Sequence, residues 1–374
     1  MKTTIALLLT AALFCGCRKS EPTHTDHDIP VNGTTPHNTV HGFYLLNEGN
    51  MGSNKATLDV FDYTTRTYRR NIFPERNPNV VKELGDVGND LKIYGGRMYA
   101  VINCSDLVEV MNAADARHIG TISVSNCRYI AFHGRYAYIS SYAGPIGVDP
   151  NARPGYIAKV DTATLEIAGR CTVGYQPEEM VVTGGRLYVA NSGGYRAPDY
   201  DTRVSVIDLA TFTVTDEIEV APNLHRMLLD NHGMIWASSR GDYNSPSSGI
   251  YRIDPDKRMV TATLPVATSR MTLCGDSIYL TGTEWSAITA SNTKRYGIID
   301  TRTAKLASDG FITDDTAKEI KVPYGIAVNP ESREILIADA GDYLTPGTLR
   351  CYSPEGRCLW SVTTGDIPSS IAFF

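Results

Sequence analysis

A unit of four short apolar runs recurs along this chain, and this repeat constrains the fold more than any other feature. The clearest copy spans residues 176–220. It reads as an inner strand, a tight turn at Gly184 and Gly185, a second strand, a long loop, and two further strands joined by a short turn. The third run of each copy ends at Asp, Asn or Ser, whose side chains initiate turns by hydrogen bonding to the following backbone. These residues are Asp62, Asn112, Asp161, Asp208, Asp254, Asp300 and Ser353. Four antiparallel strands in a unit of roughly 40–50 residues predict a β-propeller blade.

The incomplete first copy predicts how the ring closes. Seven third-strand markers give seven blades, and only the first copy, which begins at residue 42, lacks an inner strand. The final segment "PSSIAFF" has the pattern of "PEEMVV" in the clearest copy. We therefore expect the C-terminal strand to complete the first blade and to leave no open sheet edge. The predicted fold is an all-β, seven-bladed propeller of four-stranded blades, because a β-helix or two sandwiches would not explain the incomplete unit.

The first 40 residues differ in composition and are predicted to be a signal and a tether. Residues 1–16 combine an early lysine, a short apolar run and small residues before Cys17, which is typical of a lipoprotein signal peptide whose cysteine carries the lipid. An ordinary secretory signal with an incidental cysteine is the alternative. Residues 17–40 are poor in large apolar side chains, which predicts a lipidated, flexible tether before a propeller over 41–374. No cysteine or helix fixes the histidines of this region, so we expect a solvated linker rather than a metal site at His24, His27, His37 and His41.

Charge and cysteine content exclude two further classes of site. The formal net charge is -6, and the sequence lacks the basic face typical of nucleic-acid binding. Six cysteines remain beyond Cys17, and without a CxxC pair they do not predict a zinc site. In an oxidising compartment we expect a disulfide between Cys351 and Cys358 across a four-residue turn, and a second between Cys104 and Cys127 at one rim of adjacent blades.

One face of the predicted ring carries long loops rich in glycine and aromatic residues, whereas the other carries short turns. Loops between second and third strands share a face with the connections between blades. Tyr and Trp offer a flat apolar body with a polar tip, and a concave face of this kind is by default a ligand site; the alternative is that the loops only pack on one another. The candidate ligand-binding residues are Asn47, Glu48, Asn50, Met51, Asn89, Arg128, Tyr129, Tyr142, Tyr195, Tyr200, His225, Arg226, Arg240, Tyr243, Arg270, Trp285, Tyr324 and Tyr343.

Binding is favoured over catalysis on this face. The sequence has no Gly-x-Ser-x-Gly elbow, no histidine-rich metal cluster there, and no glycine-rich phosphate loop. His225 could act as an acid or base with Glu48, Glu178 or Glu284, but a ligand-contacting or structural histidine is the preferred interpretation. We therefore assign no catalytic residue and no metal ligand.

The first blade resembles a known family. Its segment "LLNEGNMGSNKATLDVFD" is similar to the opening blade of the YncE-like seven-bladed surface lipoproteins of gut Bacteroidetes. The similarity covers about residues 42–374 and includes the lipoprotein signal. Within that group, the chain most resembles the BtuG type, which binds cobalamin over the outer-membrane transporter BtuB.

The resemblance implies a function and a location. It implies a lipid-anchored protein of the outer membrane, facing the cell exterior, that binds cobalamin (vitamin B12) or cobinamide and delivers it to a TonB-dependent, BtuB-like transporter. It implies no required cofactor and no nucleic-acid partner. His225 as an axial cobalt ligand is compatible with this hypothesis but not required by it. The competing hypotheses are a glycan- or peptide-binding adhesion propeller and, third, a propeller lyase or hydrolase.

Overall fold

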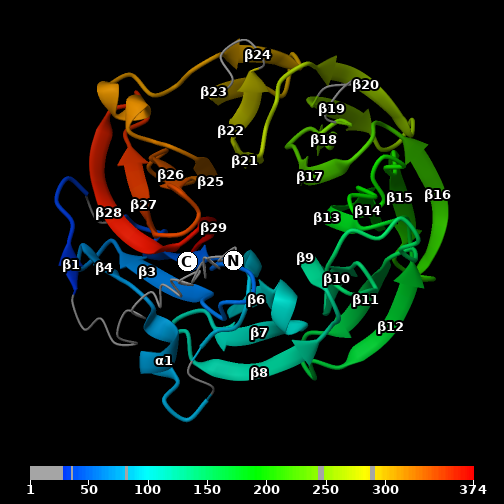
Figure 1. Ribbon diagram of the computed structural model, residues 1–374, viewed down its shortest axis with the longest axis horizontal. Helices are drawn as coiled ribbons and strands as arrows, with labels where there is room; N and C mark the ends of the chain where they lie inside the picture. The colour runs from blue at the N-terminus through cyan, green and yellow to red at the C-terminus, as the bar shows by residue number, and fades with distance from the viewer. Residues whose placement is uncertain (1–27, 35–36, 81–82, 243–247, 287–290) are drawn as a thin grey trace, which may run out of the picture.

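Seven sheets of antiparallel strands are arranged around a central axis, which confirms the predicted seven-bladed propeller (Figure 1). The computed structural model describes residues 28–34, 37–80, 83–242, 248–286 and 291–374. Blade 1 contains β1 (Ile29–Pro30), β2 (Gly42–Asn47), β3 (Thr57–Asp62), β4 (Thr67–Arg69) and, innermost, β29 (Pro368–Phe373). Blade 2 contains β5 (Gly88–Tyr94), β6 (Arg97–Ile102), β7 (Leu107–Asn112) and β8 (His118–Ser123). Blade 3 contains β9 (Cys127–His133), β10 (Tyr136–Ser141), β11 (Tyr156–Asp161) and β12 (Ile167–Thr172).

The remaining four blades repeat the same order from the axis outward. Blade 4 contains β13 (Pro177–Thr183), β14 (Arg186–Asn191), β15 (Arg203–Asp208) and β16 (Thr213–Glu219). Blade 5 contains β17 (Leu224–Leu229), β18 (Ile235–Ser239), β19 (Gly249–Asp254) and β20 (Met259–Leu264). Blade 6 contains β21 (Arg270–Cys274), β22 (Ser277–Ser286), β23 (Ser291–Asp300) and β24 (Lys305–Ser308). Blade 7 contains β25 (Pro323–Val328), β26 (Ile335–Asp339), β27 (Pro346–Tyr352) and β28 (Cys358–Asp366).

Helix is a minor component of the described part of the chain. It comprises α1 (Ile72–Arg76) and two 3-10 turns, η1 (Asn103–Ser105) and η2 (Asp315–Lys318). Among these described residues, no helix has the length and apolar character needed to cross a bilayer.

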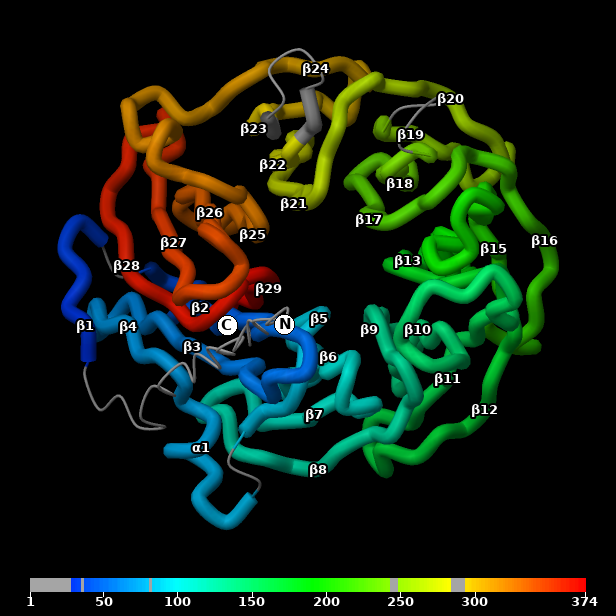
Figure 2. Tube along the Cα trace, in the orientation of Figure 1, coloured from blue at the N-terminus to red at the C-terminus, as the bar shows by residue number. Residues whose placement is uncertain are grey.

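The C-terminal strand closes the ring as the incomplete first repeat predicts. β29 pairs antiparallel with β2, from Phe43 opposite Phe373 to Asn47 opposite Pro368. Figure 2 shows both ends of the described chain in one blade, with β1 at its outer edge and β29 at its inner edge. The ring of Phe374 packs on Tyr44 with a centroid separation of 4.7 Å, so closure combines backbone pairing with apolar burial.

The hydrophobic core is distributed between the blades rather than gathered at one centre. Seven clusters of buried side chains fill the seven contacts between neighbouring sheets. Phe61 of blade 1, for example, stacks on Trp360 of blade 7 with centroids 5.2 Å apart. The outermost strands alternate between exposed and partly buried residues, as in β16, because only one of their faces packs against a neighbour.

The short turns between third and fourth strands follow the predicted aspartate rule. Asp208 Oδ1 accepts hydrogen bonds from the backbone nitrogens of Ala210 and Thr211, both at 2.9 Å. Phe212 then adopts a left-handed φ of 56°, and the pairing of β15 with β16 shifts register at this end. This pattern of a tight turn followed by a left-handed residue and a bulge is a common way to join antiparallel strands.

The structure corrects the predicted extent of the tether. Within residues 28–40, β1 adds a fifth strand to blade 1, with Ile29 opposite Tyr68. The carboxylate of Glu331 in blade 7 accepts hydrogen bonds from the backbone nitrogens of residues 38, 39 and 40 at 2.7, 2.8 and 3.0 Å. His37 packs edge-on against Tyr63 at 4.4 Å. The prediction of a flexible tether to residue 40 is therefore wrong for this stretch, because backbone pairing and a buried aromatic contact hold it.

Both predicted disulfides are also wrong in this structure, where Cys104, Cys127, Cys351 and Cys358 are free thiols. Cys351 pairs with Trp360, while Tyr352 pairs with Cys358. The two cysteines are thus offset in register and contribute to different clusters on opposite faces of the sheet. Burial raises the pKa of Cys127 to about 12 and that of Cys104 to about 11, which keeps both as neutral thiols.

One predicted loop is instead mostly strand. In blade 6, β22 and β23 remain paired from Ser277 opposite Asp300 to Ser286 opposite Ser291. Residues 282–286 and 291–296 therefore extend the hairpin, although the sequence predicts a long loop over residues 282–296. Thr and Trp have high β propensity, and this signal in "GTEWS" outweighs the glycine on which the loop prediction relied.

Candidate ligand-binding site on the loop face

The inner strands change register where they begin, on the face that carries the long loops. Such shifts occur in six of the seven inner strands. A bulge redirects the side chains beside it. In β13 the shift lies between Pro177 and Met180, and the adjacent Glu178 and Glu179 contact different partners. The bulges thus supply polar side chains to the mouth of the ring from strands whose remaining residues form the core.

Left-handed backbone conformations accompany these bulges. The residue before an inner strand has a positive φ in five blades, at Val87, Asn126, Gln176, Asn223 and Ile367. This region is costly for side chains branched at Cβ, such as Val and Ile. Left-handed residues also recur in the short turns of the opposite face, Phe212 among them, so this conformation positions the first residues of the inner strands and does not by itself mark a site.

Glu178 is the centre of the most strongly charged part of the mouth. Its side chain is only 1% exposed. Arg128 Nε and Arg240 Nη1 each lie 3.3 Å from its carboxylate, and the Tyr142 hydroxyl donates a hydrogen bond of 2.6 Å. Burial opposes ionisation of this carboxyl, but the two guanidinium groups and the tyrosine outweigh it and lower the pKa of Glu178. The buried carboxylate in blade 4 therefore lies between two arginines, one from blade 3 and one from blade 5.

A cavity of about 270 Å³ lies against this ion-pair group. The ring of Tyr142 meets Tyr195 edge to face at 5.0 Å, and Arg128 lies over the Tyr142 ring at 5.1 Å. The cavity therefore combines flat apolar surfaces with guanidinium and carboxylate groups. Its lining consists of Arg128, Tyr142, Glu178, Gly194, Tyr195, Tyr200, Asn223 and Arg240.

Glu48, in the loop after β2, occupies a comparable place on the other side of the mouth. Arg270 Nη2 lies 3.1 Å from its carboxylate, and the Tyr324 hydroxyl donates a hydrogen bond of 2.9 Å. Tyr343 packs edge-on against Tyr324 at 5.7 Å and is 43% exposed. Burial raises the pKa of Glu48, and Arg270, the Tyr324 hydroxyl and, with smaller effects, Arg128 and Arg226 offset this increase only in part.

His225 lies in the mouth but is bound to a neighbouring side chain. Its Nε2 is 2.9 Å from the hydroxyl of Tyr129, which comes from a blade two positions away. Burial lowers the pKa of His225 well below its ordinary value, and Arg240 and Arg226 lower it further. The imidazole is therefore neutral at physiological pH. Its Nε2, one of the two ring nitrogens that can bind a metal or move a proton, already contacts Tyr129.

Glu179 forms a third ion-pair group nearer the axis. Arg226 Nε lies 3.0 Å from its carboxylate, Lys92 Nζ lies 3.6 Å away, and the Met227 nitrogen donates at 3.0 Å. These contacts join blades 2, 4 and 5. Together the three groups form a layer across the ring that we call the polar layer, which comprises Glu48, Lys92, Arg128, Glu178, Glu179, Arg226, Arg240 and Arg270.

The structure brings together most, but not all, of the predicted site residues. It places ten of them in the cavity or the polar layer or against them: Glu48, Arg128, Tyr129, Tyr142, Tyr195, Tyr200, His225, Arg226, Arg240 and Arg270. Tyr324 and Tyr343 adjoin Glu48. Tyr243 lies outside the described residues, as does the side chain of Trp285, whose backbone belongs to β22.

Four predicted residues have other roles. Asn47 is fully buried and donates to Thr57 at 3.0 Å, so it fixes its own hairpin. Asn89 donates to the backbone oxygen of Arg128 and joins two blades. Asn50 accepts a hydrogen bond within its own loop, and Met51 projects into solvent. None of the four lines the cavity.

The sequence prediction omitted Glu178 and Glu179 from the site, as well as Lys92 and Asn223. A signal for the glutamates exists, because "PEEMVV" begins a buried inner strand with two adjacent carboxylates. Such residues are almost never fully buried unless they are paired. No group of His, Cys, Asp and Glu in the described part of the chain could hold a metal ion.

A family model matches residues 41–345, which is most of the propeller. The chain belongs to the family described as a domain of unknown function, DUF5074. No curated protein matches it. The fold of this DUF5074 protein is similar to several solved structures, all of low identity.

Two of these structures illustrate the similarity. Hydrazine synthase of Kuenenia stuttgartiensis has a TM-score of 0.63 and 16% identity, with 76% of this chain and 89% of that chain covered. A quinoprotein alcohol dehydrogenase-like protein of Bacteroides thetaiotaomicron has a TM-score of 0.59 and 15% identity, with 90% and 79% covered.

A third, the dihydro-heme d1 dehydrogenase NirN, has a TM-score of 0.54 and 11% identity, with 91% and 76% covered. At these identities the three similarities establish the propeller fold and nothing more.

Proposed function

We propose that this DUF5074 protein is a lipid-anchored surface protein that binds cobalamin or a related corrinoid on its loop face and delivers it to a TonB-dependent outer-membrane transporter. One observation carries the proposal. The mouth of the ring combines flat tyrosine surfaces with two arginines, Arg128 and Arg240, that share one buried carboxylate, Glu178.

The chemistry of a corrinoid matches this surface. It is a broad, nearly planar macrocycle fringed by amides, and its nucleotide loop carries one phosphodiester charge. Tyr195 and Tyr200 offer apolar planes beside the cavity, while Arg128 and Arg240 offer donors for an amide oxygen or the phosphodiester. The cavity of about 270 Å³ is too small for the macrocycle. The ring of the ligand would therefore lie across the loop face, with one substituent inside the cavity.

Preorganisation favours tight binding by such a surface. Arg128 is held by Glu178, and Tyr142 is held by the same carboxylate. Because these side chains are already ordered, binding would not bear the entropic cost of ordering them. His225 is not assigned as a cobalt ligand, since its Nε2 contacts Tyr129.

Delivery to a transporter requires a second contact surface, and the loop face provides one. Met51, Val148 and Leu344 are 71%, 74% and 62% exposed, and all three lie in loops between second and third strands. These side chains come from the loops of blades 1, 3 and 7 and are accessible to a partner protein on the loop face. We assign these residues to contact with the outer loops of the transporter.

A glycan-binding function is the second candidate. The cavity has the size of a single sugar unit, and it places Tyr195 beside Glu178 and Arg240. Aromatic planes next to charged hydrogen-bonding groups suit a sugar ring equally well.

Titration calorimetry of the mature protein tests both candidates. We expect cyanocobalamin to bind, and cobinamide, which lacks the nucleotide loop, to bind more weakly if Arg128 and Arg240 contact the phosphodiester. The matched probe is Tyr195→Ala, which should weaken corrinoid binding without changing the melting temperature. If the wild-type protein binds no corrinoid but binds oligosaccharides, the glycan hypothesis replaces this proposal.

A further inference from the structure

A second cavity lies on the axis of the ring, and its charged residues Lys92, Glu179, Arg226 and Arg270 belong to the polar layer. Its volume is about 380 Å³, and the inner strands of six blades line it: β5, β13, β17, β21, β25 and β29. We call it the axial chamber. It shares no lining residue with the cavity beside Glu178, and neither the family nor the proposed corrinoid site accounts for it.

The axial chamber has a charged end and an apolar end. Each inner strand runs from the loop face toward the face of short turns, so residues later in a strand lie deeper. Arg226 and Arg270 come early in β17 and β21, whereas Leu228 and Leu273 follow them, and Phe373 ends β29. The lining therefore changes from ionic to aliphatic along the axis. Because it continues to Pro330, in the turn after β25, the apolar end reaches the face opposite the loops.

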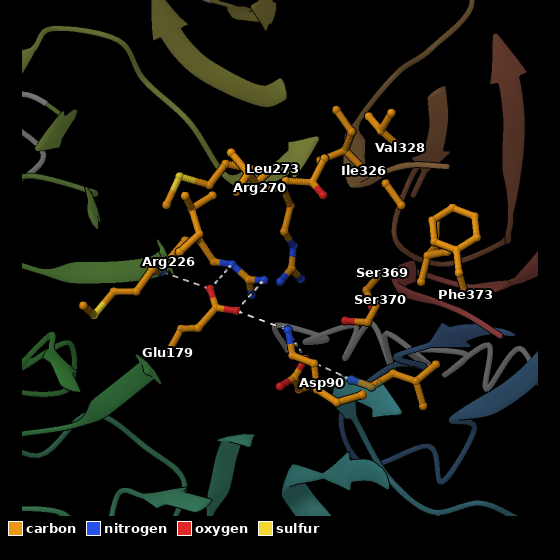
Figure 3. A pocket seen from close by; sticks show the side chains of 18 of the residues that line it. Asp90, Glu179, Arg226, Arg270, Leu273, Ile326, Val328, Ser369, Ser370 and Phe373 are labelled. Atoms are coloured by element: carbon orange, nitrogen blue, oxygen red, sulfur yellow. Dashed lines mark hydrogen bonds and ion pairs between the residues drawn. The ribbon is translucent and has the colours of Figure 1, made fainter. Parts of the chain in front are cut away.

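Arginine at the charged end has unused hydrogen-bonding capacity. Arg226 is 8% exposed, and its Nη1 has no hydrogen-bond partner. Figure 3 shows the guanidinium groups of Arg226 and Arg270 directed toward the open centre of the chamber. A buried donor without a partner costs free energy, so this atom is suited to an acceptor supplied by a ligand.

The charges of the lining favour an anion. Three cationic side chains, Lys92, Arg226 and Arg270, line the chamber with two carboxylates, Asp90 and Glu179, while Glu48 pairs with Arg270 from outside the lining. When the other members of the polar layer, Arg128, Arg240 and Glu178, are included, five cations face four carboxylates. One further negative charge would balance this layer. The planar fork of a guanidinium matches a carboxylate, and the aliphatic walls at the other end disfavour a second charge or a strongly hydrated group.

We propose that the axial chamber binds a small organic acid with an apolar body, such as a medium-chain monocarboxylate. Its carboxylate accepts hydrogen bonds from Arg226 at the charged end. Its hydrocarbon part packs against Leu228, Leu273 and Phe373. The ligand enters from the turn face, so the chamber and the loop-face site are occupied independently.

Calorimetric titration of the mature protein with octanoate tests the proposal, with octanol and inorganic phosphate as matched probes. Octanol keeps the apolar body and lacks the charge, whereas phosphate keeps the charge and lacks the body. A hydrogen bond to a charged group corresponds to about 10-fold or more in affinity. We therefore expect octanoate to bind at least about 10-fold more tightly than octanol, and phosphate not to bind at all. No binding of octanoate, or equal binding of octanol, would overturn the proposal.

Two variants test whether octanoate binds in the axial chamber. The double variant Glu179→Gln with Arg226→Gln removes the guanidinium together with its ion-pair partner, so no lone charge stays buried. We expect it to lose about 10-fold or more in octanoate affinity. Leu273→Asp puts a negative charge on a half-buried position of the apolar wall. It should weaken octanoate binding, and it alters no residue of the polar layer. Tyr195→Ala on the loop face is the control and should leave octanoate binding unchanged. If both chamber variants bind octanoate as the wild type does, or if the control alone loses it, the chamber is not the site.

Discussion

Glu178 and Glu48 occupy opposite sides of the same mouth, and their pKa values shift in opposite directions. Both are buried, and both accept a hydrogen bond from a tyrosine hydroxyl. Glu178 lies between two arginines, Arg128 and Arg240, and has a lowered pKa. Glu48 has one arginine in contact and has a raised pKa. At these two sites the second guanidinium outweighs the cost of burying the charge.

This difference divides the loop face into two functional halves. The half around Glu178 is a fixed ionic framework, because its one carboxylate is shared by Arg128, Arg240 and the Tyr142 hydroxyl. The half around Glu48 is closer to balance between its neutral and ionised forms, so a ligand group could replace its contacts at lower cost. We therefore expect the Glu178 half to position the ligand and the Glu48 half to adapt to it.

The largest expected effect is on stability when each carboxylate is neutralised. Glu178→Gln removes the buried carboxylate that Arg128 and Arg240 share, and breaking a buried ion pair costs about 3 kcal/mol or more. Glu48→Gln should cost about 1 kcal/mol, since one arginine loses its partner while a costly buried charge is also removed. Denaturant unfolding at neutral pH measures both values. Equal losses would mean that the second arginine does not distinguish the two sites.

A smaller effect is expected on ligand affinity when the aromatic planes are removed. Tyr195→Ala, in the Glu178 half, should weaken corrinoid binding by about 2 kcal/mol, because a buried aromatic contact at a binding site is often worth this much. Tyr343→Ala, in the Glu48 half, removes a ring that is 43% exposed in the free protein and should cost less. Calorimetry with cyanocobalamin gives the two affinities, and thermal unfolding checks that both variants stay folded. A larger loss for Tyr343→Ala would reverse the assignment of the two halves.

The architecture of this protein could be predicted from its sequence because its determinants are local and repeated. Asp208 binds the backbone two and three residues further along, and other turns repeat this arrangement, with Asp62 and Asp254 as examples. The closing strand also follows from one incomplete copy of the repeat. These features need no knowledge of contacts between distant parts of the chain.

The site was less predictable because its contacts join residues that are distant in sequence. Glu178 is 50 positions from Arg128 and 62 from Arg240, so its neighbours cannot be found from local spacing. The offset of Cys351 from Cys358 depends on a register shift near the end of the hairpin, which the turn residues do not reveal. The docking of residues 38–40 depends on the single distant side chain of Glu331.

The pH dependence of stability sharpens the contrast between the two glutamates, with effects on the order of 1 kcal/mol for each unit of pKa shift. For Glu178 the folded-state pKa is below the unfolded value of roughly 4.3, so its contribution is present above that value and is lost as the pH falls through the folded-state pKa. For Glu48 the folded-state pKa is raised, so its contribution is full below the unfolded value and is lost as the pH rises through the folded-state pKa.

Unfolding curves between pH 3 and 8 for the wild type and the two glutamine variants measure these contributions. Relative to the wild type, Glu178→Gln should lose more stability as the pH rises through the acidic range, and Glu48→Gln should lose less. Parallel pH profiles for the two variants would contradict the opposite shifts.

The smallest expected effect lies on the opposite face, in the turn after β15, where the Asp208 carboxylate binds the backbone of its own turn. Asp208→Ala removes the acceptor of the hydrogen bonds from Ala210 and Thr211. Because the turn is exposed and water can replace the carboxylate, we expect a loss in the free energy of unfolding that is smaller than for either glutamate variant. Corrinoid affinity should be unchanged, since Asp208 borders neither the loop-face cavity nor the axial chamber. Denaturant unfolding and calorimetry on the same preparation measure the two quantities, and Asp208→Asn, which keeps an acceptor oxygen, should restore most of the lost stability. A loss of affinity in Asp208→Ala at unchanged stability would show that the turn face communicates with the mouth, and the two faces would then not be independent.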